Sequence, residues 1–434
     1  MKKSLGLIFT LILLMSSVLV GCGSKDTASS DSKDSKDGNE KVTLKVTVWN
    51  YDTTPEFKAL FTAYEKENPN VTIEPVDIEA AQYDQKLTTM LAGNDDSDVL
   101  TMKNLIGYSN YAYRGQLKDM TSYAKTLDED KYMGTLDYMK DDNGKIYALP
   151  YRNDFWVLYY NKKMFDQAGV KYPDNITWEE YRDLAKKLTS GSGDTKVYGA
   201  YNHVWRSITN STAAAQVVGK PDALVKGDYS FIKDMYKTFL GMQEDKSVLD
   251  YGTAKSTNTT YASQFETEKA AMLPMGTWYM AGVLNSKNAG KTNVDWAIAP
   301  LPQKEKGKVK TWGSPTAFAV NKNAAHSKEA EKFVKWASGE EGAKVVAGVG
   351  VVPAYRTDAI NETYFKVAGM PSDELSKKAF KTDFFNIEMP MDKNSAAIDK
   401  ILNEEHDLIM IGENSVDKGL KAMEDRVKSE VLKK

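Results

Sequence analysis

Strand-like and helix-like hydrophobic patterns alternate along most of this chain, and the alternation limits the folds open to it. Val42, Leu44, Val46 and Val48 keep the period of two that is typical of a strand. Further strands are predicted near 71–73 and 99–100, and helices near 57–64, 83–91, 178–188, 328–337, 339–347, 394–411 and 414–432. Strands that alternate with helices predict an α/β fold with mostly parallel sheets.

Length and charge narrow the class of protein. The chain has 434 residues, more than one hydrophobic core usually serves, so we expect two lobes. It carries 57 basic and 60 acidic residues, a net charge of -3. Without a basic excess, we expect no nucleic-acid partner.

The only cysteine, Cys22, ends the run Leu19-Val20-Gly21-Cys22. Two lysines and an apolar stretch over 5–20 precede it, as in a secretory signal, and the stretch is short for a membrane span. The four-residue run resembles the bacterial lipobox, in which the cysteine becomes the lipidated N-terminus. We therefore expect residues 1–21 to be a lipoprotein signal peptide, Cys22 to be lipidated, and the protein to be tethered at the outer face of the cell membrane. An ordinary signal peptide or membrane span with an incidental cysteine is the alternative.

Residues 22–40 predict a disordered linker behind that cysteine. Ser, Asp and Lys fill 12 of the 18 positions in 23–40, and no large apolar residue is present. Such a segment cannot bury enough surface to fold.

The order of segments after residue 41 resembles the carbohydrate type of extracellular solute-binding protein, whose relatives include the maltose-binding proteins of ABC importers. The segments that carry the resemblance are 46–49, 57–69, 97–99, 115–120, 144–151, 158–162, 269–272, 276–278, 328–330 and 333–334. The resemblance implies two α/β lobes joined by a hinge of several crossing strands, with the ligand between them.

Carried onto this chain, the resemblance places the hinge crossings near 149–153, 313–317 and 349–355. One lobe would be 41–150 plus 315–352, and the other 151–314 plus 353–434. The implied partners are a carbohydrate ligand and the permease subunits of an ABC importer. We expect a monomer, no cofactor, no metal and no catalytic residue.

A sugar site needs flat aromatic rings for the C–H faces of the sugar and polar side chains for its hydroxyl groups. Of the eight tryptophans, Trp178, Trp296 and Trp336 lie in strand or helix patterns and are expected in the core, as is Tyr83. The remaining tryptophans lie at strand ends or in loops and are the ligand-binding candidates: Trp49, Trp156, Trp205, Trp278 and Trp312.

Three polar residues complete the predicted site. Asn50 follows the first strand, and ligands of α/β sheets gather at the carboxyl ends of strands. By resemblance, Asn104 falls in a ligand loop and Asp154 where the family carries a ligand-binding acid, with a hinge salt bridge as the alternative for Asp154. The resemblance also gives Trp278, in Gly276-Thr277-Trp278, the role of a sugar-stacking tryptophan.

Two other functions stay open from the sequence. A binding protein for a phosphorylated polyol or a peptide would rely on Arg152 or Lys103 rather than on tryptophan. A glycoside hydrolase would need two carboxylates flanking the scissile bond. The histidines His203, His326 and His406 show no metal-ligand spacing.

Overall fold

The computed structural model describes residues 41–433. The predictions for the signal peptide, Cys22 and the linker therefore lie outside the described residues. Within 41–433, no helix has the length and apolar content needed to cross a bilayer. The strands are β1 Val42–Trp49, β2 Val71–Ile78, β3 Val99–Met102, β4 Ala148–Asn161, β5 Met272–Gly276, β6 Trp296–Pro300, β7 Lys310–Val320 and β8 Phe384–Ile387.

The α-helices fill the intervals between the strands and the C-terminal region. They are α1 Pro55–Glu67, α2 Tyr83–Ala92, α3 Leu105–Tyr113, α4 Thr121–Ala124, α5 Thr135–Tyr138, α6 Lys162–Ala168, α7 Trp178–Leu188, α8 Ser207–Ala213, α9 Lys233–Glu244, α10 Tyr251–Ser256, α11 Tyr261–Phe265, α12 Tyr279–Asn288, α13 Ser327–Ser338, α14 Glu340–Gly348, α15 Asp358–Phe365, α16 Glu374–Ala379, α17 Ser395–Met410 and α18 Val416–Arg426.

Local sequence signals account for many of these boundaries. Helix α1 begins with Pro55 in its first turn, where the missing N–H costs nothing, and buries the face that carries Phe57 and Leu60. Helix α7 begins with the predicted capping box, in which Thr177 and Glu180 bond each other's backbone N–H groups. Tyr83 and Trp178 are buried as predicted.

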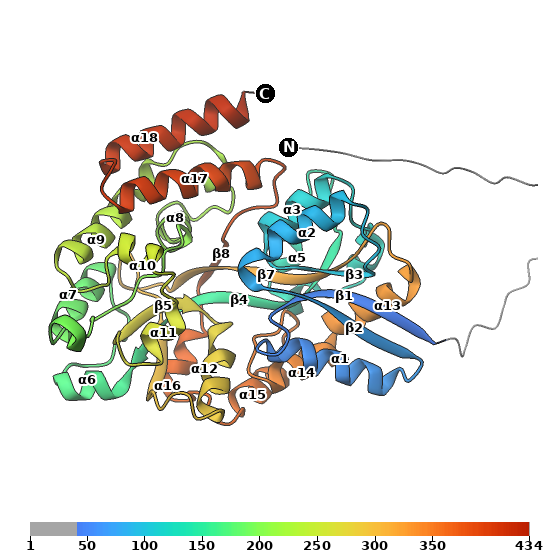
Figure 1. The fold of residues 1–434 in the computed structure, drawn as a ribbon, viewed down its shortest axis with the longest axis horizontal. Helices are drawn as coiled ribbons and strands as arrows, with labels where there is room; N and C mark the ends of the chain where they lie inside the picture. Colours follow the sequence, from blue (N-terminus) through green and yellow to red (C-terminus); the bar gives the residue numbers. More distant parts are fainter. Residues whose placement is uncertain (1–40, 434) are drawn as a thin grey trace, which may run out of the picture. The chain divides into compact units, whose positions relative to one another are not determined.

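The sheet order is β2-β1-β3-β7-β4-β5, with β6 on β4 and β8 on β7. Strand β1 is parallel to β2 and β3, and β7 is parallel to β8. The prediction of mostly parallel sheets is wrong, because β7 is antiparallel to β3, and β4 is antiparallel to β5, β6 and β7. Strands β4 and β7 carry the chain across the molecule in opposite directions, and this pairing of distant segments leaves no signal in the local hydrophobic pattern (Figure 1).

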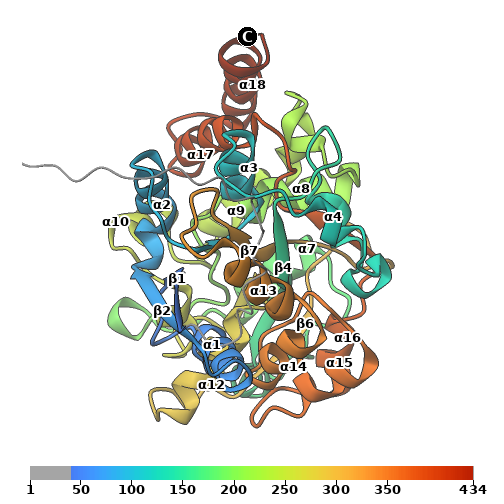
Figure 2. The ribbon, with the colours of Figure 1, turned by 90° about the vertical axis from the view of Figure 1, so that its right-hand side faces the viewer.

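Two hydrophobic cores lie on either side of the β4–β7 crossing. The first core is built mainly from residues 44–151 and 317–351, and the second mainly from 155–312 and 352–427. Strand β4 contributes Leu149 and Tyr151 to the first core and Trp156 to the second. Helices α13 and α14 follow β7 and lie beside α1 (Figure 2). The molecule is therefore a two-lobed α/β protein, as predicted.

A third segment crosses between the cores beside β4. The Asn153 N–H donates to the Val352 carbonyl at 3.1 Å, and the Ala354 N–H donates to the Tyr151 carbonyl at 3.1 Å. The predicted crossings near 149–153 and 313–317 coincide with β4 and β7, and this pairing lies in the third predicted segment, 349–355.

A buried polar cluster fixes α8 against α17 in the second core. His406 of α17 is 1% exposed, and its Nδ1 lies 3.0 Å from the Tyr236 hydroxyl. Arg206, which precedes α8, donates from Nε to Asp399 of α17 at 2.7 Å. Because Trp205 adjoins Arg206, this cluster also holds the loop that carries Trp205.

The pKa of His406 gives a pH-dependent stability. Burial lowers this pKa from 6.5 to about 3, so the unfolded chain binds a proton at His406 between these values and the folded chain does not. The free energy of unfolding should therefore fall as the pH drops below 6.5, by about 1.4 kcal/mol per pH unit from this group. Between pH 7 and pH 5, wild type should lose about 2 kcal/mol more than His406→Asn in urea titrations. Equal losses in the two proteins would contradict this assignment.

Candidate functional site

The predicted site residues gather around the β4–β7 crossing, although they come from distant parts of the chain. Trp49 ends β1, Asn50 directly follows it, and Asn104 follows β3. Asp154 and Trp156 lie on β4, and Trp312 lies on β7. Trp278 follows β5, and Trp205 precedes α8.

The residues on the first lobe have structural partners of their own. Trp49 is 6% exposed and packs edge-on against Phe57 and Tyr83. The Asn50 side chain accepts a hydrogen bond from the Ala80 N–H at 2.9 Å, and Asn104 caps the N-terminus of α3. Their contact with a ligand stays a prediction.

Four of the predicted tryptophans form one aromatic cluster in the second lobe. Trp156 and Trp312 stack with ring centroids 4.4 Å apart, and both are buried. Trp278 lies 5.9 Å from Trp156 and 6.3 Å from Trp205. Trp205 is 39% exposed and Trp278 is half-buried, so a buried indole pair supports an accessible one.

Gly276 explains why the Trp278 ring lies on this cluster. Gly276 pairs with Trp156 across β5 and β4. A Cβ atom at position 276 would lie 1.8 Å from Cζ3 of Trp278. Only glycine therefore lets the indole fold back over the end of β5.

A buried charge network lies beside the aromatic cluster. Arg152 forms ion pairs with Glu56 and with Asp154, whose Oδ2 lies 3.0 Å from Nε, and Nε donates a hydrogen bond to the Thr316 hydroxyl at 3.1 Å. Asp154, 2% exposed, also accepts a hydrogen bond from the Thr277 hydroxyl at 2.8 Å. Burial raises the pKa of Asp154 and of Glu56, and the Arg152 charge opposes that rise. The network joins β4 to α1 and to the residue before Trp278.

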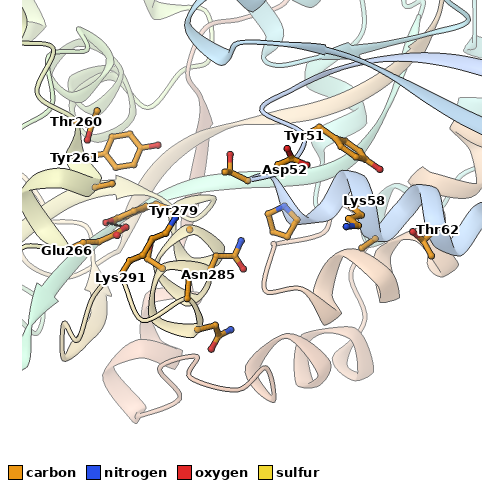
Figure 3. Close-up of a pocket in the computed structure, with 18 of the residues that line it drawn as sticks. Tyr51, Asp52, Lys58, Thr62, Thr260, Tyr261, Glu266, Tyr279, Asn285 and Lys291 are labelled. Carbon is orange, nitrogen blue, oxygen red and sulfur yellow. Dashed lines mark hydrogen bonds between the residues drawn. The ribbon is translucent and has the colours of Figure 1, made fainter.

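A groove of about 1170 Å³ opens next to Tyr261. Residues from the β1–α1 loop and α1 line one side, and residues of α11, α12 and the following loop line the other (Figure 3). Tyr51 and Lys58 lie on the first side, and Tyr261, Tyr279 and Asn285 on the second (Figure 3).

Sequence reasoning missed the tyrosines of this groove. Tyr51 directly follows Trp49-Asn50, and that adjacency is a signal that could have pointed to it. Tyr261 and Tyr279 lie more than 200 residues further along, and no spacing in the sequence shows that they line the same groove as Tyr51. Among residues 41–433, no group of three or more metal-ligating side chains is present.

The charge network predicts a large loss of stability when its cation is removed. Arg152→Met leaves Glu56 as a buried carboxylate without a paired cation and leaves Asp154 with the charge of Arg356 alone, so we expect the free energy of unfolding to fall by about 3–5 kcal/mol. Urea titrations measure the loss. Lys344→Met, which removes exposed ion pairs with Glu340 and Glu341, is the control and should cost less than about 1 kcal/mol. Similar losses in both variants would show that the network contributes no more than a surface pair.

Comparison with known proteins relates this geometry to a family. A family model described as bacterial extracellular solute-binding protein matches residues 51–344. The chain is 26% identical over 348 residues to the multiple sugar-binding protein of Streptococcus mutans, covering 77% of this chain and 78% of the relative.

Solved structures agree with that match. A sugar transporter from Rhizobium etli, in an open conformation, is 38% identical with a TM-score of 0.76, covering 89% of this chain and 99% of the other. An ABC substrate-binding protein from Listeria monocytogenes, in complex with cycloalternan, has the same fold, with a TM-score of 0.75 at 22% identity, covering 90% of this chain and 99% of the other. This chain belongs to the bacterial extracellular solute-binding protein family.

Proposed function

We propose that this protein is a lipid-anchored receptor outside the cytoplasmic membrane that binds a carbohydrate, specifically an oligosaccharide, between its lobes and delivers it to an ABC importer. Family membership supports a binding function rather than catalysis. The names of the relatives from Streptococcus mutans and Rhizobium etli support a sugar as the solute.

The observation that carries the proposal is the accessible indole pair, Trp205 and Trp278, supported by Trp156 and Trp312. Indole rings stack on the C–H faces of sugar rings, and a buried ring behind each one limits its movement. Rigid rings lose little conformational entropy when a ligand binds.

The adjoining groove supports an oligosaccharide over a single sugar. Its volume, about 1170 Å³, exceeds the 300–1,000 Å³ that is typical for small-ligand pockets. Tyr261 contacts Trp205, with ring centroids 6.0 Å apart, and also lines the groove, so a sugar chain stacked on the indoles can continue along it.

The two lobes would close on the ligand by rotating about the β4–β7 crossing. We assign 41–150 plus 315–352 to one rigid lobe and 151–314 plus 353–434 to the other. The open and closed forms would then differ in the surface presented to the permease subunits. Binding as a monomer is sufficient, because both sides of the groove come from one chain.

The charged residues favour this function over the two alternatives. Lys103 donates to the Ala80 carbonyl at 2.9 Å, and Arg152 is paired with Glu56 and Asp154, so both cations are already engaged without an anionic solute. Asp154 is buried, forms an ion pair with Arg152 and accepts a hydrogen bond from Thr277. A carboxylate held in this way does not suit the role of general acid in a glycoside hydrolase.

A thermal-shift screen tests the sugar proposal. Purified protein is heated with mono-, di- and oligosaccharides, polyols, phosphorylated polyols and peptides. A ligand at a hundred times its dissociation constant adds about 2.7 kcal/mol and should raise the melting temperature. We expect the largest shift from an oligosaccharide. A shift from a non-sugar solute alone would overturn the carbohydrate assignment.

Two variants then test the indole pair by calorimetric titration with that sugar. Trp278→Ala should weaken binding at least tenfold, because the stacking surface is lost. Gly276→Ala should also weaken it, because the new methyl group displaces the retained indole. Trp336→Ala, which removes a half-buried tryptophan bonded to Glu67 on the first lobe, is the matched control. Unchanged affinity in Trp278→Ala would remove Trp278 from the site.

The lipid anchor predicts a shift in cellular location. Cys22→Ser removes the thiol that would carry the lipid, so the variant should leave the membrane fraction and lose labelling by radioactive palmitate. Since Cys22 is the only cysteine, any thioether-linked label in wild type is assigned without ambiguity. Wild-type protein that carries no label would contradict the anchor.

A further inference from the structure

The loop that carries Trp205 also carries a histidine with no assigned role. His203 is half-buried and meets Trp205 edge-on, with ring centroids 4.4 Å apart and an interplanar angle of 78°. It meets Tyr261 in the same way at 5.3 Å and 87°. His203 therefore lies between a ring of the indole pair and a ring that lines the groove.

The hydrogen bonds of Tyr201 settle which nitrogen of His203 carries the proton. The Tyr201 hydroxyl donates to the Thr259 carbonyl at 2.8 Å, and its oxygen lies 3.1 Å from Nδ1 of His203. A carbonyl can only accept, and the hydroxyl has one hydrogen, so that hydrogen goes to Thr259. Nδ1 of His203 must then be the donor to the Tyr201 oxygen.

Burial keeps the Tyr201 hydroxyl and the His203 imidazole in these protonation states. Burial raises the pKa of the Tyr201 phenol, which therefore keeps its hydrogen at neutral pH. Burial lowers the pKa of His203 to about 4, so its imidazole is neutral. A neutral imidazole with its proton on Nδ1 has a lone pair on Nε2.

That lone pair has no partner among the described residues. No hydrogen bond to Nε2 of His203 exists within 41–433, and this atom is not among the fully buried unpaired ones, so it keeps some accessible surface. Nε2 of His406, in contrast, is buried and unpaired in the core. The loop is also held firmly, because the Tyr201 N–H donates to the Met272 carbonyl of β5 at 2.9 Å.

We propose that His203 is a ligand-binding residue whose Nε2 accepts a hydrogen bond from a hydroxyl group of the carbohydrate stacked on Trp205 and Trp278. This inference rests on the proposed function and adds a specificity to it. The group of the ligand that faces His203 must be a donor. A carboxylate or phosphate at that point would meet a lone pair and be disfavoured, which selects neutral sugars.

Two substitutions of His203 distinguish the role of its acceptor, Nε2, from the role of the hydrogen bond between Nδ1 and Tyr201. His203→Asn places an amide near Nδ1 and keeps the bond to Tyr201, but it lacks an acceptor at Nε2. His203→Gln reaches the Nε2 position with an amide oxygen and gives up the bond to Tyr201. Affinities of both variants and wild type are measured by calorimetric titration with maltotriose, raffinose, mannobiose and mannitol, and melting temperatures report folding.

An acceptor at Nε2 predicts that His203→Asn binds about tenfold more weakly than wild type, while His203→Gln stays within about threefold. A purely structural role predicts the reverse order, because Gln is the variant that loses Tyr201. That reverse order, equal losses, or wild-type affinity in His203→Asn would each overturn the inference while sugar binding by wild type stands. Wild type that binds none of the four probes would contradict the proposed function, and this inference with it.

Discussion

The antiparallel pairing of β4 with β7 is the interaction on which the rest of the structure depends. Residues 148–155 of β4 pair with 313–319 of β7, and a register shift lies between Pro150 and Arg152. Such a bulge bends a strand and redirects its side chains. On one side of it, Leu149 enters the first core, and beyond it Trp156 enters the second. One continuous strand thus contributes to both lobes and brings Arg152 and Asp154 to the junction.

The crossing also places two kinds of chemistry next to each other. The charge network of Glu56, Arg152 and Asp154 ends at Thr277, and the next residue is Trp278. Buried ions are costly unless they are paired and hydrogen-bonded, and here each carboxylate has a partner. The position of Trp278 is therefore linked, through the Thr277 hydroxyl group and Asp154, to β4, the strand that joins the lobes.

Local patterns in the sequence predicted the elements well, because caps, prolines and hydrophobic periods act within a few residues. The start of α1 at Pro55 and the capping box of α7 are examples. The direction of β4 against β7 could not be predicted in this way, because it depends on pairing between residues about 160 positions apart. The same limit applies to the site. Sequence reasoning selected the tryptophans one by one but could not show that Trp156 and Trp312 stack, that Trp49 is enclosed, or that Tyr51 and Tyr261 line one groove.

The division of each core between distant segments determines the order in which the chain can fold. The first core needs Phe318 and Phe333 as well as Leu44 and Phe57, so its N-terminal part has no complete hydrophobic interior until more than 330 residues are available. Contacts of such long sequence separation make folding slow. A chain that threads through a membrane from its N-terminus would therefore stay unfolded for most of its passage and complete both lobes only after β7 and α13 have emerged.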